Sequence, residues 1–298
     1  MGAARCATLR PDGLAHGSWL NDGDDVPELT LDDVTLNYDQ SGDGPDIVWL
    51  AAGDHPGSNW RRWQVPAFEP GWRNTTYDAR GVGKTGSRTP SPWTIEVHAA
   101  DLARLIEATC APPVALVGLS MGSLTAVQLA HDRPDLVRCA AAMGTCVRKT
   151  GFILEWEEAE IGLRRTGGSL PADFATTHYA LCYYPAEVLG DDELWAELRS
   201  FIAADFEARD GAMLAAQWQA CLDFDSSELL PRTTVPIHAI AFSEDVQTPP
   251  QRVRQVAELA ADGHFHLLEG LGHGSAFGHR PEAVNACIRA ILDGSSAA

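Results

Sequence analysis

The stretch that decides the fold is Val114-Ala115-Leu116-Val117-Gly118-Leu119-Ser120-Met121-Gly122-Ser123-Leu124-Thr125. Its first four residues are apolar and predict a short buried strand, and a helical pattern of apolar residues follows directly. Between the two lies the pattern Gly-x-Ser-x-Gly. A serine on so tight a strand-to-helix turn is forced to positive φ, and its hydroxyl lies at the head of a helix, where N–H groups favour negative charge. This context predicts a nucleophilic Ser120, and a glycine-rich turn with an incidental serine is the alternative.

The length and composition indicate one large globular unit. The chain has 298 residues, of which 45% are hydrophobic, and this is enough to bury a large core with an inserted subdomain. The formal net charge is −19. Because this charge repels polyanions, we expect neither a nucleic acid nor a membrane as a partner.

The cysteines and the N-terminus predict the compartment. The seven cysteines are an odd number without metal-ligand spacing, so we expect free thiols and no metal site. Residues 1–25 lack the apolar run of a signal peptide, and no stretch reaches the length of a membrane span. The expected protein is cytoplasmic, with a flexible N-terminal tail over residues 1–26.

Strands and helices alternate on both sides of a purely helical segment. A hairpin-like pair of strands is expected at 28–31 and 34–38, and buried strands follow at 46–51, 74–77, 114–118, 139–143, 237–242 and 265–268. Helices between the buried strands predict an α/β fold with a doubly wound, mostly parallel sheet. We assign residues 27–146 and 228–298 to this core. Residues 147–227 carry helical patterns at 152–163, 171–181, 192–206 and 211–222, and predict a helical cap or lid.

A serine, an aspartate and a histidine each follow a predicted strand of the sheet. Ser120, Asp245 and His273 should therefore meet at the edge where the carboxyl ends of the strands lie. A serine hydroxyl needs a base within hydrogen-bond reach, and a carboxylate can orient an imidazole for that task. Asp245 is the best candidate acid, because the loop after the preceding strand, residues 144–150, contains no carboxylate.

A glycine pattern at residues 81–86 suggests a second kind of site. Gly81-Val82-Gly83-Lys84-Thr85-Gly86 has the spacing of a phosphate-binding loop. The last glycine of the pattern, Gly86, is not followed by the Lys-Ser/Thr that ends a P-loop, and no clear helix follows directly. We therefore favour a structural loop over a nucleotide site.

These motifs together resemble the α/β-hydrolase superfamily, in its serine-nucleophile esterase, lactonase and perhydrolase-like branch, over residues 28–293. The resemblance rests on Gly118–Gly122, Asp78–Gly83, Ser243-Glu244-Asp245 with Pro249, and Gly272-His273-Gly274. It implies Ser120 as nucleophile, His273 as base and Asp245 as the residue that orients it, with no cofactor. It also implies an oxyanion hole from the backbone N–H groups of Met121 and Asp54, or of His55 if the loop is aligned on Pro56-Gly57.

The expected activity is hydrolysis of a carboxylic ester, lactone or thioester of a small apolar molecule through an acyl-enzyme. A cofactor-free haloperoxidase or perhydrolase, and a hydrolase of carbon–carbon bonds, are alternatives on the same triad, and a non-catalytic binding protein is a further one. The aromatic residues suggest a pocket for the small-molecule substrate, for which we select Trp60, Trp156, Tyr183 and Trp218. The sequence leaves a homodimer open.

Overall fold

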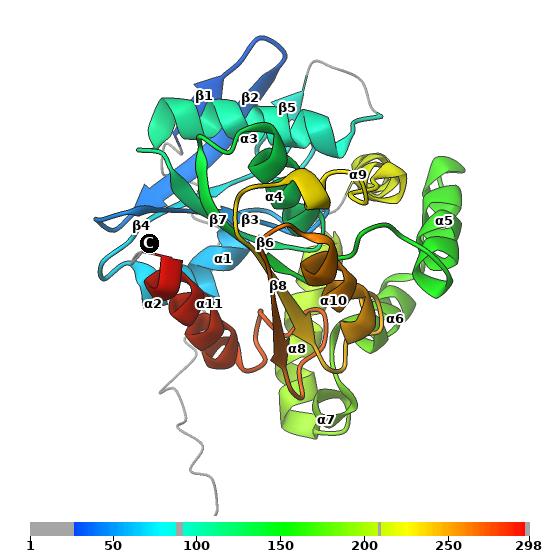
Figure 1. Ribbon diagram of the computed structural model, residues 1–298. Helices are drawn as coiled ribbons and strands as arrows, with labels where there is room; N and C mark the ends of the chain where they lie inside the picture. The colour runs from blue at the N-terminus through cyan, green and yellow to red at the C-terminus, as the bar shows by residue number, and fades with distance from the viewer. Residues whose placement is uncertain (1–26, 88–91, 208–209, 296–298) are drawn as a thin grey trace, which may run out of the picture.

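The computed structural model describes residues 27–87, 92–207 and 210–295 of the chain (Figure 1). The expected N-terminal tail, residues 1–26, lies outside the described residues.

A nine-stranded sheet forms the centre of the molecule, in the order β1-β2-β4-β3-β6-β7-β8-β9, with β5 paired to β2. The strands from β4 to β9 in this order run parallel, whereas β1, β2 and β5 pair antiparallel at one side. The predicted α/β fold with a mostly parallel sheet is therefore confirmed. The strands are β1 (Glu28–Thr30), β2 (Val34–Ser41), β3 (Asp46–Leu50), β4 (Arg73–Tyr77), β5 (Gly86–Ser87), β6 (Val114–Leu119), β7 (Val137–Met143), β8 (Ile237–Phe242) and β9 (Gly263–Leu268).

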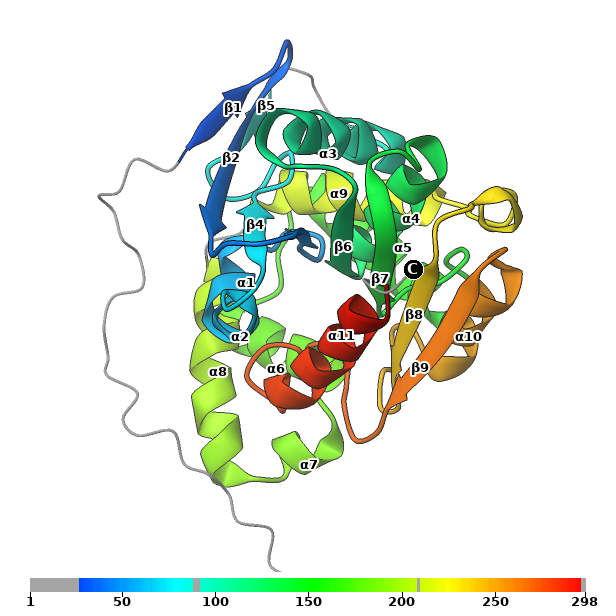
Figure 2. The ribbon, with the colours of Figure 1, turned by 60° about the vertical axis from the view of Figure 1, so that its left-hand side comes forward.

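Helices cover both faces of the sheet, and this explains why β6 reads as an unbroken apolar run. Val114 and Leu116 belong to one hydrophobic core, while Ala115 and Val117 point to the opposite face and belong to another. The first core packs against α3 (Ile95–Thr109), α4 (Met121–Asp132) and α10 (Pro250–Leu259), and the second against α1 (Ser58–Trp63), α2 (Val65–Phe68) and α11 (Pro281–Ser295). Figure 2 shows α11 in front of the sheet and α3 behind it.

A purely helical segment is inserted between β7 and β8, within the expected range 147–227. It contains α5 (Phe152–Arg165), α6 (Ala172–Tyr183), α7 (Ala186–Leu189), α8 (Asp192–Glu207) and α9 (Gly211–Asp223). The single turn α7 was not predicted, because four residues after Pro185 are too few to show a helical period. These helices bury small apolar clusters of their own around Tyr179 and Val188.

The turn from β6 into α4 has the strained geometry that the sequence predicts. Ser120 adopts φ 54° and ψ −118°, in a region that a non-glycine residue seldom occupies. A Cβ atom on Gly118 would collide with the carbonyl oxygen of Gly122, and one on Gly122 would collide with the carbonyl oxygens of Leu50 and Ala51. Gly118 thus permits the tight turn into α4, and Gly122 permits α4 to begin close to the end of β3.

We predict that Gly122→Ala destabilises the protein by about 1–3 kcal/mol, because the added methyl group meets fixed backbone oxygens. Gly162→Ala is the matched control. This glycine is exposed within α5 and has open space around its Cα, so alanine there should stabilise by about 0.5–1 kcal/mol. Urea unfolding of both variants measures the two changes. A Gly122→Ala variant as stable as the wild type would show that α4 does not depend on this approach.

Candidate active site

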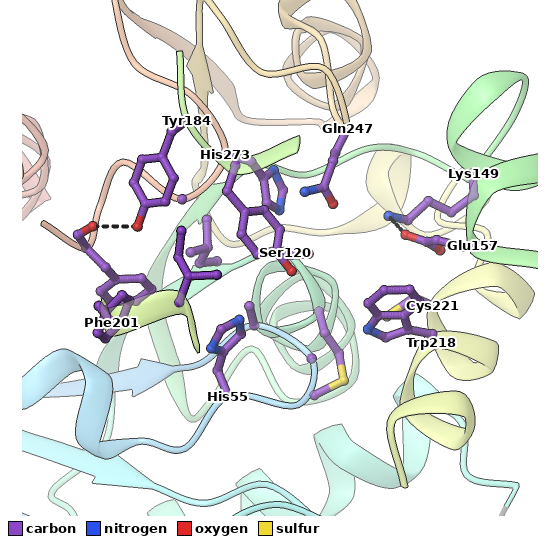
Figure 3. A pocket seen from close by; sticks show the side chains of 18 residues that line it. His55, Ser120, Lys149, Glu157, Tyr184, Phe201, Trp218, Cys221, Gln247 and His273 are labelled. Carbon is purple, nitrogen blue, oxygen red and sulfur yellow. Dashed lines mark hydrogen bonds and ion pairs between the residues drawn. The ribbon is translucent and has the colours of Figure 1, made fainter. Parts of the chain in front are cut away.

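The sheet brings the three expected residues to one edge. Ser120 follows β6, Asp245 follows β8 and His273 follows β9, each at the carboxyl end of its strand. Ser120 and His273 line the same cavity, and Figure 3 shows both in its centre. Asp245 is 3% exposed and lies behind the imidazole ring.

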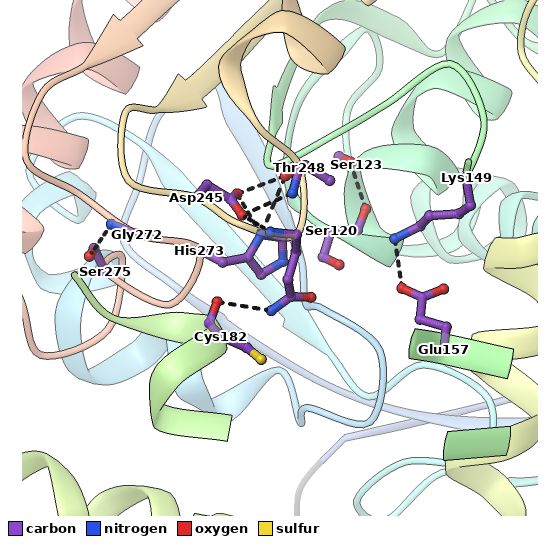
Figure 4. Close-up of polar contacts among 11 residues, drawn as sticks. Ser120, Ser123, Lys149, Glu157, Cys182, Asp245, Thr248, Gly272, His273 and Ser275 are labelled. Carbon is purple, nitrogen blue, oxygen red and sulfur yellow. Dashed lines mark hydrogen bonds and ion pairs between the residues drawn. The ribbon is translucent and has the colours of Figure 1, made fainter. Parts of the chain in front are cut away.

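The histidine and the aspartate form a short hydrogen bond. His273 Nδ1 lies 2.7 Å from Asp245 Oδ2 (Figure 4). A carboxylate only accepts hydrogen bonds, so the proton belongs to Nδ1. Nε2 then carries the lone pair, on the side of the ring away from Asp245.

Asp245 is kept ionised by its neighbours. Burial alone opposes its charge, but the electrostatic attraction of His273 and the hydrogen bonds from His273 and Thr248 outweigh burial and hold the pKa of Asp245 below its ordinary value. The Thr248 hydroxyl donates to Oδ2 at 2.7 Å, and the backbone N–H groups of Gln247 and Thr248 donate to Oδ1 at 2.8 and 2.9 Å. The residues just after Asp245 therefore fix the carboxylate in place.

Two neighbours pack against the imidazole ring of His273, Gly144 and Tyr183. Gly144 follows β7 with φ 56°, and a Cβ there would lie 2.9 Å from His273 Cε1. The ring of Tyr183 is also stacked against the imidazole, with centroids 6.3 Å apart and an interplanar angle of 23°. The carbonyl of Tyr183 also accepts the N–H of Gly274 at 2.8 Å. The end of α6 thus supports the histidine loop directly.

The loop after β3 departs from the expected oxyanion hole. The N–H of Asp54 donates to Gln217 Oε1 at 2.5 Å, and the N–H of His55 donates to the Ala52 carbonyl at 3.2 Å. His55 lines the cavity, but Asp54 is not among the described residues that do so. The structure therefore does not support the preferred assignment of Asp54. Met121 is the first residue of α4, where a backbone N–H has no acceptor within the helix, and this residue lines the cavity.

Gln217 holds two loops beside the cavity in place, and this role was not predicted from the sequence. It is fully buried in α9, and its Nε2 donates to the Arg80 carbonyl at 2.9 Å while its Oε1 accepts from Asp54. One side chain thereby ties the inserted helices to the loops after β3 and β4. A glutamine in an amphipathic helix gives no sequence signal of such long-range partners.

Of the four aromatic residues selected for the pocket, two line the cavity and two do not. Tyr183 and Trp218 line the cavity, and Trp156 packs against Trp218 with ring centroids 5.4 Å apart. The expectation for Trp60 is wrong, because this residue is fully buried in the core between Trp49 and Phe277. The cavity itself is narrow, with a volume of about 50 Å³.

A buried ion pair stands in the cavity wall and was also not predicted. Lys149 Nζ lies 2.8 Å from Glu157 Oε1, and their side chains are only 5% and 7% exposed. Burial alone opposes the charge on Lys149, but the Glu157 carboxylate outweighs it and raises the pKa of the ammonium group above its ordinary value. The cavity therefore combines a mixed aromatic and aliphatic lining with one charged corner.

The glycine-rich loop at 81–86 is built around an internal carboxylate. Asp78 accepts the N–H of Gly57 and the N–H of Lys84, both at 2.9 Å. A Cβ on Gly83 would collide with the same carboxylate. The carboxylate of Asp78 thus lies against the glycine-rich loop and accepts one of its N–H groups, in agreement with the structural interpretation of this loop.

Neither a metal site nor a membrane span is found in the described ranges. They contain no group of three or more His, Cys, Asp or Glu side chains that could hold a metal ion. Within 27–87, 92–207 and 210–295, no helix combines the length and the apolar character needed to cross a bilayer.

Comparison with known proteins agrees with this fold. The family described as alpha/beta hydrolase fold matches residues 51–183. The non-heme bromoperoxidase BpoC of Mycobacterium tuberculosis is 31% identical over 257 residues, which are 86% of this chain and 96% of that protein. Its crystal structure superimposes with a TM-score of 0.82 at 29% identity, over 87% of this chain and 96% of that one.

Two further relatives have other names. The carbamate hydrolase RutD of Stutzerimonas stutzeri is 26% identical, over 72% of this chain and 79% of that protein. The 3-oxoadipate enol-lactonase 2 of Acinetobacter baylyi is 26% identical, over 89% and 95%. The fold and the strand-end site define an α/β-hydrolase fold protein. By its similarity to these relatives, the chain belongs to the α/β-hydrolase family.

We predict that Thr248→Val lowers the free energy of unfolding by about 1–2 kcal/mol near neutral pH, because a hydrogen bond to a buried carboxylate is lost. A carboxyl group with a depressed folded-state pKa stabilises above its unfolded pKa, and this contribution disappears as the pH falls through the folded-state pKa. The loss should therefore shrink below about pH 4, the unfolded value for aspartate.

Denaturant unfolding at several pH values tests this dependence. Thr176→Val is the control, since its buried hydroxyl donates to the uncharged Ala172 carbonyl, and its effect should not change with pH. A Thr248→Val deficit that stays constant on acidification would contradict the role given to Asp245.

Proposed function

We propose that the protein is a serine hydrolase that cleaves a carboxylic ester, lactone or thioester of a small molecule through an acyl-enzyme. One observation carries the proposal. Ser120 is held in a strained conformation at the head of α4, in the same cavity as a histidine whose Nδ1 is engaged by a buried aspartate.

The proposed reaction uses these groups in order. Ser120 Oγ attacks the carbonyl carbon while His273 Nε2 takes the hydroxyl proton, and Asp245 stabilises the resulting imidazolium. His273 then gives this proton to the departing alcohol or thiol. Water, deprotonated by His273, attacks the acyl carbon and releases the acid, and the proton returns to Ser120.

Two backbone N–H groups would stabilise the negative charge on the carbonyl oxygen. We propose Met121 as the first donor, since it follows the nucleophile at the start of a helix. For the second donor we favour His55 over Asp54, because it lines the cavity and its present hydrogen bond, at 3.2 Å, is longer than the 2.5 Å bond of Asp54. Gln217 would then hold the loop in position from α9.

The substrate acyl group should be short. The cavity volume of about 50 Å³ has room for a few water molecules, and Trp218, Tyr183 and Phe201 enclose it from the inserted helices. We therefore propose that these helices, residues 147–227, act as a cap that selects the substrate.

Perhydrolysis is a second candidate, and the bromoperoxidase name of the 31% identical relative favours it. Hydrogen peroxide would replace water in the second step and attack the acyl group on Ser120. The products are then a peracid and the free serine, and no cofactor takes part.

We predict that Ser120→Ala lowers kcat on short para-nitrophenyl esters by about 10³-fold or more, because the covalent step is lost. The same change should abolish labelling by a fluorophosphonate probe, which intact-mass spectrometry detects. Ser200→Ala, an exposed serine on α8, is the control and should leave both readouts unchanged. Wild-type protein that neither turns over any ester nor reacts with the probe would contradict the serine hydrolase proposal.

The perhydrolase candidate predicts peracid formation from acetate and hydrogen peroxide that depends on Ser120. A halogenation assay with monochlorodimedone in bromide measures the peracid. Ester hydrolysis without peracid formation would leave the hydrolase proposal in place and exclude this candidate.

A further inference from the structure

The buried ion pair has two features that place it in substrate recognition. Lys149 lies on the loop after β7 and Glu157 on α5, and both side chains line the cavity that contains Ser120. In Figure 3 the pair occupies one end of the cavity beside Trp218 and Cys221, and the ammonium group of Lys149 is on the side that faces Ser120.

Stability alone does not account for this pair. Moving two charges out of water costs several kcal/mol per ion, and well-packed apolar residues of similar volume often stabilise a protein as much or more. The neighbouring residues Trp218 and Cys221 would suit such an apolar replacement.

The pair also has hydrogen-bonding capacity that the protein does not use. Of the N–H groups of Lys149, one donates to Glu157 Oε1. Glu157 Oε2 is buried and has no hydrogen-bond partner among the described residues. A buried acceptor without a partner costs about 1–3 kcal/mol, so a ligand group that donates to it would gain binding energy.

We propose that Lys149 and Glu157 form the recognition site for a neutral amide-like group on the substrate, apart from the bond that is cleaved. The carbonyl oxygen of that group would accept from Lys149, and its N–H would donate to Glu157. This inference rests on the proposed serine hydrolase function and specifies its substrate class, an ester or lactone that carries an amide.

Charge favours a neutral group over a carboxylate at this position. The two side chains sum to zero charge, so the corner offers no net attraction to an anion. A substrate carboxylate on Lys149 would face the second oxygen of Glu157, and the chain as a whole carries a formal charge of −19. An amide supplies both a donor and an acceptor without adding charge.

Two matched substrate series test the proposal on both sides of the ester bond. The first contains the para-nitrophenyl esters of pentanoic, succinamic and succinic acid, which end in a methyl, an amide and a carboxylate. The second contains the acetates of meta-cresol, meta-hydroxybenzamide and meta-hydroxybenzoic acid. In at least one series, we expect the amide member to have a kcat/KM about tenfold above that of its apolar counterpart.

Variants of Lys149 and Glu157 test whether this ion pair causes the preference for the amide substrate. Lys149→Met with Glu157→Met should reverse the preference in favour of the apolar member, and Glu157→Gln should shift it towards the carboxylate by leaving Lys149 unneutralised. The control Asp173→Asn with Arg199→Gln removes an exposed ion pair between α6 and α8, and should keep the wild-type ratios. Because Glu157→Gln preserves shape, it covers the case in which the double variant does not fold.

The possible results distinguish failure of the recognition site from failure of the serine hydrolase proposal. Wild-type preference for the apolar or the carboxylate members in both series, or ratios that the pair variants leave unchanged, would overturn the recognition site while the hydrolase proposal stands. If no ester of either series is hydrolysed, the hydrolase proposal fails and the inference falls with it.

Discussion

The close approach of α4 to β3 is the constraint on which the rest of the site depends. Gly122 brings the start of the helix against the carbonyls at the end of β3, and a longer side chain there would force the two elements apart. This contact holds Ser120 at positive φ and presents its hydroxyl at the edge of the sheet. It also places the N–H of Met121 beside the loop after β3. Nucleophile and proposed oxyanion donors are thus fixed by one backbone contact.

The parts of the structure that could be predicted are those with a local signal. The strands β6 and β8 read as apolar runs because both of their faces are buried. Ser120, Asp245 and His273 could be selected because each directly follows such a strand, and parallel strands deliver their following loops to one edge. Sheet topology thereby converts three local patterns into one site.

Residues whose partners are distant in sequence could not be predicted. Gln217 reaches residues 163 and 137 positions away, and its amphipathic helix does not indicate them. Lys149 and Glu157 look like ordinary surface charges until the inserted helices enclose them. For Trp60 the error runs the other way. This residue was selected from the sequence for the pocket, but Phe277, in the loop before α11, packs over it and buries it in the core. Long-range packing decides each of these cases.

The two hydrogen bonds of Gln217, to Asp54 and to Arg80, also limit which inserted segments this fold could accept. Its amide joins the segment proposed to act as a cap to the loop that would stabilise the oxyanion. If both proposals hold, the groups that select the substrate and the groups that stabilise the oxyanion are mechanically connected in this chain. An inserted segment taken from a relative would bring a new pocket. Without a side-chain amide at the position of Gln217, however, the N–H of Asp54 would lose its hydrogen-bond acceptor. In this chain, an exchanged segment would therefore keep the loop geometry only if it carried an amide at position 217.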